Sequence, residues 1–154
     1  MLGLSQTLGY AIKALCCVPE PDGCPVAVKN IAACTNIPRP YLAKLIHKLS
    51  KAGVIKTIRG NRGGVLLSRP SREIALLEII RIIEGEDVLN GCLLGMTYCE
   101  DKRSCPTHRF WNPIRKKIEQ HLMNTTLDEV VLFERKRLEL SCNHRNGRNR
   151  SKGL

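Results

Sequence analysis

Three cysteines and one histidine fall within seventeen residues in the second half of this 154-residue chain. They form the pattern Cys92-x6-Cys99-x5-Cys105-x2-His108. Thiolate sulfur and imidazole nitrogen are the ligands that proteins use for zinc and for iron–sulfur clusters. The gaps of six and five residues are wider than those of a usual zinc knuckle, so the spacing favours a cluster over zinc. A thiol redox function of the same residues stays open.

Two other interpretations concern Cys105 and His108. A histidine three residues after a cysteine can share its side of a helical turn and complete a ligand set, or it can simply begin a helix. The pair could also serve as a nucleophile and its base, but that chemistry requires a third group that orients the base. The sequence offers no such group, so we expect the protein not to be an enzyme.

Charge is distributed unevenly along the chain. The formal net charge is +11, of which residues 1–72 carry +9, residues 73–134 carry −4 and residues 135–154 carry +6. Residues 28–69 hold nine Lys or Arg and no Asp or Glu. Such a run is either a solvated surface or the face of a domain that binds a polyanion, and its complete lack of acids favours the second. With 4% aromatic residues, the chain lacks the stacking platform of a single-stranded RNA reader.

The first half has the element order of a winged helix-turn-helix. Apolar periodicity predicts helices over residues 5–18, 26–33 and 39–52. Two β-branched or aliphatic runs, residues 54–59 and 65–69, then flank a Gly-rich tip that suits a hairpin. The third helix carries an apolar stripe of Tyr41, Leu42, Leu45, Ile46 and Leu49. Its other face carries Pro40, Lys44, Lys48 and Lys51.

This arrangement predicts duplex DNA as the partner of the first half. The major groove admits one α-helix, and phosphates attract the cations beside it. Arginine at the tip of a wing can enter the minor groove. An ordinary solvated face remains the alternative for Lys44 and Lys48, and packing against the core is the alternative for Tyr41. The expected DNA-binding residues are Arg39, Pro40, Tyr41, Lys44, Lys48, Lys51, Arg59, Gly60, Asn61 and Arg62.

The second half is predicted to be helical around the cysteine-rich loop. We expect a helix over residues 76–84 that stops at Gly85, and a longer helix over residues 107–124 after the loop. Thr126 and Glu129 form a capping-box pattern for one more short helix through residue 133. The Arg- and Asn-rich residues that follow are expected to be disordered.

The chain contains eight cysteines but no sign of secretion. No basic flank precedes the first apolar residues, so we expect no signal peptide and a cytoplasmic location. The longest apolar stretch, residues 74–83, is interrupted by Glu78 and Arg81 and is too short to span a membrane. A reducing compartment is therefore the default for the five cysteines outside the loop, which are Cys16, Cys17, Cys24, Cys34 and Cys142.

Taken together, the motifs resemble the Rrf-two family of bacterial winged helix-turn-helix transcriptional regulators. The resemblance covers residues 1–133 in order. The matching stretches are GYAIKAL at residues 9–15, residues 40–54, RGNRGG at 59–64, IIRIIEG at 79–85, the three loop cysteines, and Thr126-Leu127. Residues 105–111 most resemble the branch of iron–sulfur cluster regulators.

The resemblance implies a mainly α-helical fold with a small β-hairpin wing. It also implies a homodimer, in which helices after residue 108 cross and each winged domain reads half of a palindromic operator. It further implies that Cys92, Cys99 and Cys105 ligate an iron–sulfur cluster, with His108 as the fourth ligand of a 2Fe–2S site. Because other branches hold 4Fe–4S clusters through three cysteines, that type also stays open.

We therefore expect a cluster-binding transcriptional repressor that senses iron, redox or nitric oxide status. The alternative is a winged-helix regulator with a structural zinc or a thiol switch. The expected layout is a DNA-binding domain (1–72), a connecting helix (73–90), a ligand loop (91–108), dimerisation helices (109–134) and a basic tail (135–154).

Overall fold

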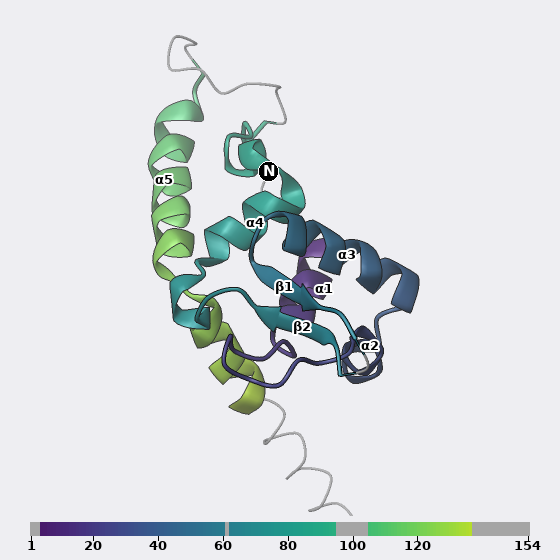
Figure 1. The fold of residues 1–154 in the computed structure, drawn as a ribbon. Helices are drawn as coiled ribbons and strands as arrows, with labels where there is room; N and C mark the ends of the chain where they lie inside the picture. The colour runs from purple at the N-terminus through teal and green to yellow at the C-terminus, as the bar shows by residue number, and fades with distance from the viewer. Residues whose placement is uncertain (1–3, 61, 95–104, 137–154) are drawn as a thin grey trace, which may run out of the picture.

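The computed structural model describes residues 4–60, 62–94 and 105–136, and it confirms a mainly helical fold with one two-stranded hairpin (Figure 1). Residues 127–136 form a further helix, called helix 127–136 below. In chain order, the other elements are α1 (Gln6–Leu15), α2 (Val28–Thr35), α3 (Arg39–Lys51), β1 (Ile55–Ile58), β2 (Gly64–Leu67), the 3₁₀-helix η1 (Ser71–Glu73), α4 (Leu76–Glu84), the 3₁₀-helix η2 (Glu86–Leu89) and α5 (His108–Asn124).

Helices α2 and α3 form the helix-turn-helix. Asn36 ends α2 in the left-handed region (φ 57°), which its short polar side chain tolerates. Pro38 caps α3, and Pro40 occupies its first turn, where no intrahelical hydrogen bond is lost. The α2 prediction began two residues too early. The cause lies in Val26, whose backbone pairs with Val65 and continues the sheet instead of starting a helix.

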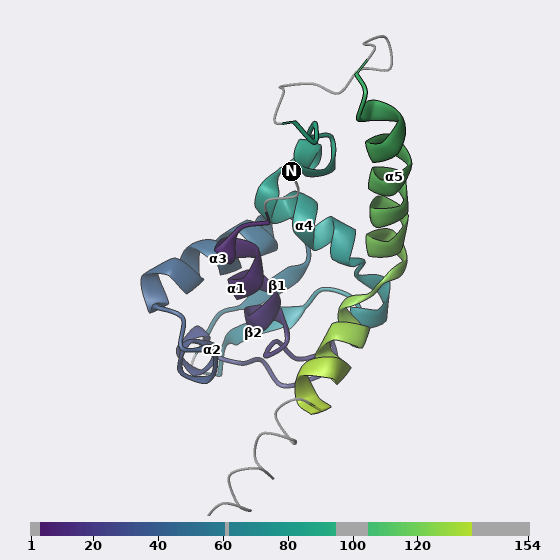
Figure 2. The same cartoon turned by 180° about the vertical axis from the view of Figure 1, so that it is seen from behind.

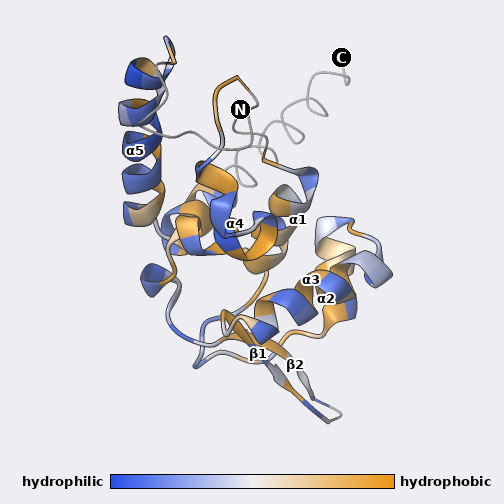
Figure 3. Cartoon of the chain, turned by 90° about the horizontal axis from the view of Figure 1, so that it is seen from above, coloured by the Kyte–Doolittle hydropathy of each residue, from blue (hydrophilic) through white to orange (hydrophobic). Residues whose placement is uncertain are grey.

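The wing is an antiparallel hairpin in which Ile55 pairs with Leu67 and Ile58 pairs with Gly64. Both strands are shorter than the sequence predicted. A Cβ atom at Gly64 would lie 2.5 Å from the backbone of Val26, so only glycine lets the two segments approach. The hairpin therefore packs against the segment before α2, while its tip extends beyond the helices (Figure 3).

Helix α4 lies at the centre of the fold. Its apolar face buries Leu77, Ile79, Ile80 and Ile83 against the core, which gives the orange bands of this helix in Figure 3. It begins at residue 76 and stops at Gly85, as the sequence predicted. Gly85 has a φ of 105°, which a side chain would disfavour, so the helix ends there.

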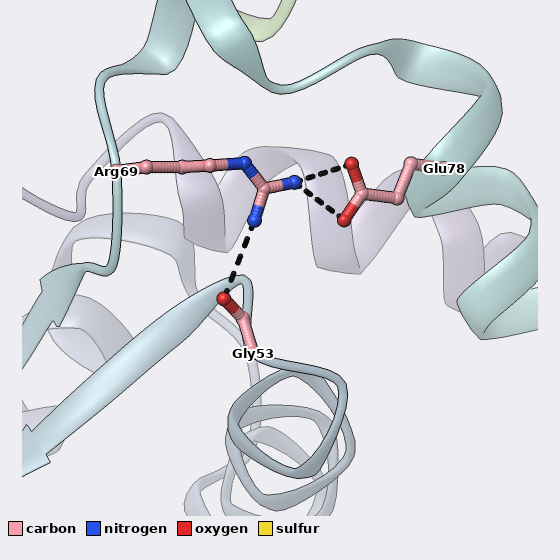
Figure 4. A network of polar contacts seen from close by, with 3 residues as sticks. All are labelled: Gly53, Arg69 and Glu78. Atoms are coloured by element: carbon pink, nitrogen blue, oxygen red, sulfur yellow. Dashed lines mark hydrogen bonds and ion pairs between the residues drawn. The ribbon is translucent and has the colours of Figure 1, made fainter.

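A partly buried ion pair joins the segment after the wing to α4. Both carboxylate oxygens of Glu78 accept hydrogen bonds from Nη2 of Arg69, at 2.6 and 2.5 Å (Figure 4). The other terminal nitrogen of Arg69 donates to the carbonyl oxygen of Gly53 at 3.4 Å. Arg69 thus ties the end of β2 and the turn after α3 to α4. Although it belongs to the acid-free basic run, this arginine neutralises an acid of the same chain.

Helix α5 stands beside α4 at one side of the molecule (Figures 1 and 2). Arg81 of α4 donates to Glu119 of α5 at 2.6 Å. The far end of α5 is held by Ala75, which pairs with Thr126 in an isolated β-bridge. The carboxylate half of the predicted capping box is present, because Glu129 accepts a hydrogen bond from the backbone N–H of Thr126 at 3.0 Å.

No helix in the described part of the chain is both long enough and apolar enough to cross a membrane. The basic tail was expected to be disordered from residue 135, but Arg135 and Lys136 belong to helix 127–136. From residue 137 onward the tail lies outside the described residues.

Candidate nucleic-acid interface and metal centre

Helix α3 has one buried face and one exposed face. Leu42, Leu45, Ile46 and Leu49 are at most 6% exposed and pack in the core. The predicted residues Arg39, Pro40, Lys44 and Lys51 are all exposed, as is His47. The apolar stripe therefore anchors the helix so that a basic surface faces outward.

Tyr41 connects α3 to α1. Its ring packs edge-to-face on Tyr10, with ring centroids 5.6 Å apart and an interplanar angle of 82°. Its hydroxyl hydrogen-bonds to the hydroxyl of Thr7, 2.5 Å away. The structure thus places this predicted DNA-binding residue in contacts that position the start of α3.

Lys48 connects α3 to α4. Its Nζ donates a hydrogen bond to the carbonyl oxygen of Ile83 at 3.0 Å. That carbonyl belongs to the last turn of α4, where helices have unpaired carbonyls and a partial negative charge. The contact fastens α3 to the end of α4, and nothing in the sequence pattern indicated it.

The wing supplies the second basic group. Arg59, Gly60 and Arg62 are exposed at the tip, and Gly60 has a φ of 114° that favours glycine. Asn61, the remaining predicted tip residue, lies outside the described residues. The exposed residues of α3 and the wing tip give two separate basic elements on one winged domain.

The described parts of the cysteine-rich loop lie at its two ends. Cys92 is only 6% exposed, whereas Cys105 is half-buried. His108 is the first residue of α5, and its backbone N–H donates to the carbonyl oxygen of Cys105 at 3.1 Å. The hydroxyl of Thr107, 3.2 Å from Cys105 Sγ, lowers the pKa of that thiol, with help from the backbone of Thr107. Cys99 lies outside the described residues.

Two contacts hold the first end of the loop against α5. The indole N–H of Trp111 donates to the carbonyl oxygen of Gly91 at 3.0 Å, next to Cys92. Arg115 donates to the carbonyl oxygen of Asn90 at 3.3 Å. The segment carrying Cys92 is therefore fastened to the first turns of α5, immediately after Cys105. The sequence predicted the helix that carries Trp111, and the structure adds this hydrogen bond.

The residues at these two ends suit a soft metal group. Two thiols and an imidazole come from segments in mutual contact, and thiolate with imidazole is a donor set for iron–sulfur clusters and zinc. Within residues 4–60, 62–94 and 105–136, no three His, Cys, Asp or Glu side chains gather into a metal site. The third predicted cysteine ligand, Cys99, lies outside these described residues.

A helix-turn-helix with a basic recognition helix and a basic wing defines the class of winged-helix DNA-binding regulators. The sequence matches the family model of Rrf2, described as an iron-dependent transcriptional regulator, over residues 4–132. The chain belongs to this family. The resemblance found in its motifs is thereby confirmed.

Individual relatives agree with this assignment. An HTH-type transcriptional regulator of Aquifex aeolicus is 32% identical over 136 residues, which cover 87% of this chain and 94% of that protein. The structure of CymR, the global cysteine regulator of B. subtilis, has a TM-score of 0.73 at 27% identity and covers 86% of this chain and 98% of its own. The structure of T. potens IscR has a TM-score of 0.66 at 30% identity, and the match covers 84% of this chain and 86% of that chain. These relatives are transcriptional regulators and not enzymes.

Proposed function

We propose that this protein is a cluster-binding transcriptional repressor that acts as a homodimer on palindromic operator DNA in the cytoplasm. The observation that carries the proposal is the attachment of the Cys92 segment to the first turns of α5 through Trp111 and Arg115. It joins the predicted ligand loop to the helix that we assign to dimerisation. In this proposal residues 1–72 bind DNA, 73–90 connect, 91–108 hold the cluster, 109–134 dimerise and 135–154 form a basic tail.

The DNA contacts are assigned to the exposed basic residues of α3 and the wing. Arg39 and Pro40 begin the helix where a recognition helix meets base edges, and Lys44 and Lys51 lie along its exposed face. Among the remaining predicted residues, Tyr41 and Lys48 have contacts that hold α3 in place. At the wing tip, Arg59 and Arg62 flank Gly60 and Asn61 and are assigned to the minor groove.

Dimerisation is assigned to α5 because this helix leaves apolar surface uncovered. Trp111 is its buried residue, whereas Ile114, Ile118 and Leu122 are only half-buried. Phe110 is 66% exposed and Met123 is 57% exposed. A second copy of α5 packed against this helix would bury Phe110, Ile114 and Ile118, which recur every four residues along one face.

In the proposed centre, Cys92, Cys99 and Cys105 hold an iron–sulfur cluster and His108 supplies the fourth ligand, with 2Fe–2S favoured over 4Fe–4S. When bound there, the cluster supplies sensitivity to iron, redox or nitric oxide status. The chain's own residues connect the ligand loop to the helices α5 and α4. Trp111 couples the loop to α5, and Arg81 couples α5 to α4 through Glu119. A change in the loop can therefore alter how two winged domains are placed on DNA.

Anaerobic purification tests the proposal through the visible absorption spectrum and an assay for iron and sulfide. We expect iron and sulfide in the wild type. Changing Cys92, Cys99 or Cys105 to Ala should abolish the absorption and leave a folded dimer. Cys24→Ser, which alters an exposed cysteine outside the loop, is the matched control and should keep the cluster.

Stoichiometric zinc without sulfide would contradict the cluster and favour the structural-zinc alternative. A protein with neither metal nor sulfide, in which Cys105 reacts selectively with an alkylating reagent, would favour a thiol switch. The contact between Cys105 Sγ and the hydroxyl of Thr107, 3.2 Å away, is the observation behind that second candidate. Either result would leave the DNA-binding assignment standing.

A further inference from the structure

A second group of cysteines lies in a pocket that the proposed function does not use. The pocket has a volume of about 180 Å³ and lies between the end of α1, the end of α2 and helix 127–136. Cys17 and Cys34 line it together with Arg135 of helix 127–136. The sequence placed both among the cysteines outside the ligand loop and paired neither of them.

The two sulfur atoms are nearly in bonding position. Cys17 Sγ lies 3.4 Å from Cys34 Sγ, and its S–H donates to the Cys34 sulfur. A disulfide has a sulfur–sulfur distance of about 2.05 Å, so the two sulfur atoms must approach each other by about 1.4 Å to bond. Cys17 lies in the turn after α1, held by a bond from its N–H to Ala14, and Cys34 lies in the last turn of α2.

The two thiols differ in access to solvent. Cys34 is exposed, whereas Cys17 is only partly so. Burial, followed by the hydrogen bond to Cys34, raises the pKa of Cys17 to about 12. Cys17 therefore keeps its proton at neutral pH and directs it at the sulfur of Cys34, which is the atom an oxidant in solution can reach.

We propose that Cys17 and Cys34 form a dithiol site that peroxide converts into an intramolecular disulfide between the ends of α1 and α2. The Cys34 sulfur attacks one oxygen of hydrogen peroxide. The O–O bond breaks, and Cys34 becomes a sulfenic acid while the other oxygen leaves as water with the thiol proton. The Cys17 sulfur then attacks the Cys34 sulfur while its proton passes to the hydroxyl on Cys34. The S–O bond breaks, and the hydroxyl leaves as a second water with the proton of Cys17.

The overall step turns two thiols and one peroxide into one disulfide and two waters, with two electrons passing from sulfur to oxygen. It does not depend on the cluster, since none of its atoms belongs to the ligand loop. Cys34 is two residues before Asn36, where α2 ends ahead of α3. The disulfide would therefore lock the packing of α1 on the helix-turn-helix. A thiol reductant restores the open pair.

The test uses the full-length protein treated with one equivalent of hydrogen peroxide, alkylated, digested with trypsin and analysed by mass spectrometry. Cleavage after Lys29 separates the two cysteines into peptides 14–29 and 30–44, because Arg39 precedes a proline and resists cleavage. We expect these peptides to become linked and to separate on reduction. The cysteines of the ligand loop lie in other peptides, so their oxidation cannot imitate this product.

Matched variants assign the bond. Cys16→Ser and Cys24→Ser should keep the link, whereas Cys34→Ser and Cys17→Ser should lose it. Because Cys17 is partly buried, Cys17→Ala is a second substitution at that position, in case serine is not tolerated there. Circular dichroism checks that each variant is folded. A link that survives in both Cys17 variants overturns the proposal. The proposal is also overturned if Cys34 is still recovered as an alkylated thiol when peroxide has already oxidised Cys24.

Discussion

Lys48 has one role by sequence pattern and another in the structure. By sequence it belongs to a basic stripe that faces DNA phosphates. In the structure its ammonium donates to the Ile83 carbonyl at the end of α4. Lys48→Met keeps most of the apolar stem and removes the charge. Lys44→Met makes the same change one turn earlier on the exposed face of α3, and it is the control.

The expected loss in stability follows from two contributions. A hydrogen bond contributes about 0.5–1.5 kcal/mol, and a cation at a helix C-terminus contributes about 0.3–1 kcal/mol. These contributions overlap, and Lys48 is exposed, so we expect Lys48→Met to lower the free energy of unfolding by about 1 kcal/mol. For a chain of this size, that lowers Tm by about 2–4 °C. Lys44→Met should change stability by less than about 0.5 kcal/mol.

Urea unfolding measures the stabilities, and DNA binding at several salt concentrations provides the second assay. A lost phosphate contact lowers the dependence of log K on log salt by about 1 per contact. We expect that decrease for Lys44→Met and not for Lys48→Met. If Lys48→Met instead keeps its stability and lowers the salt dependence as Lys44→Met does, the lysine contacts phosphate and the cap on α4 is energetically irrelevant.

Three further predictions concern the wing, the hairpin packing and the ligand set. Arg59→Ala should weaken binding to a selected operator by about 1–3 kcal/mol in a mobility-shift titration, and unchanged binding would remove Arg59 from the interface. Gly64→Ala places a Cβ 2.5 Å from the backbone of Val26 and should cost about 1–3 kcal/mol in urea unfolding. Gly9→Ala, in α1 with nothing within 4 Å, should be neutral or stabilising, and equal effects of the two changes would refute the clash. His108→Ala should give a protein whose visible absorption decays faster in air, and an unaltered decay would place the fourth ligand elsewhere.

Features that depend on neighbouring residues could be predicted from the sequence. The apolar stripe of α3 predicted its buried face, because helical periodicity alone decides which side chains share a side. Gly85 predicted the end of α4, because a positive φ is a local requirement. Thr126 and Glu129 are only three positions apart, and the hydrogen bond from the Thr126 N–H to the Glu129 carboxylate formed as the capping-box pattern predicted.

Pairings between distant residues could not be predicted in this way. Lys48 and Ile83 are 35 positions apart, and Cys17 and Cys34 are 17 apart. Whether a lysine faces solvent or caps another helix depends on where that helix packs. The packing is decided by burial of apolar surface, which is not directional along the chain. The sequence by itself determined the elements, the basic character and the family, and only the tertiary structure decided which polar and sulfur atoms meet.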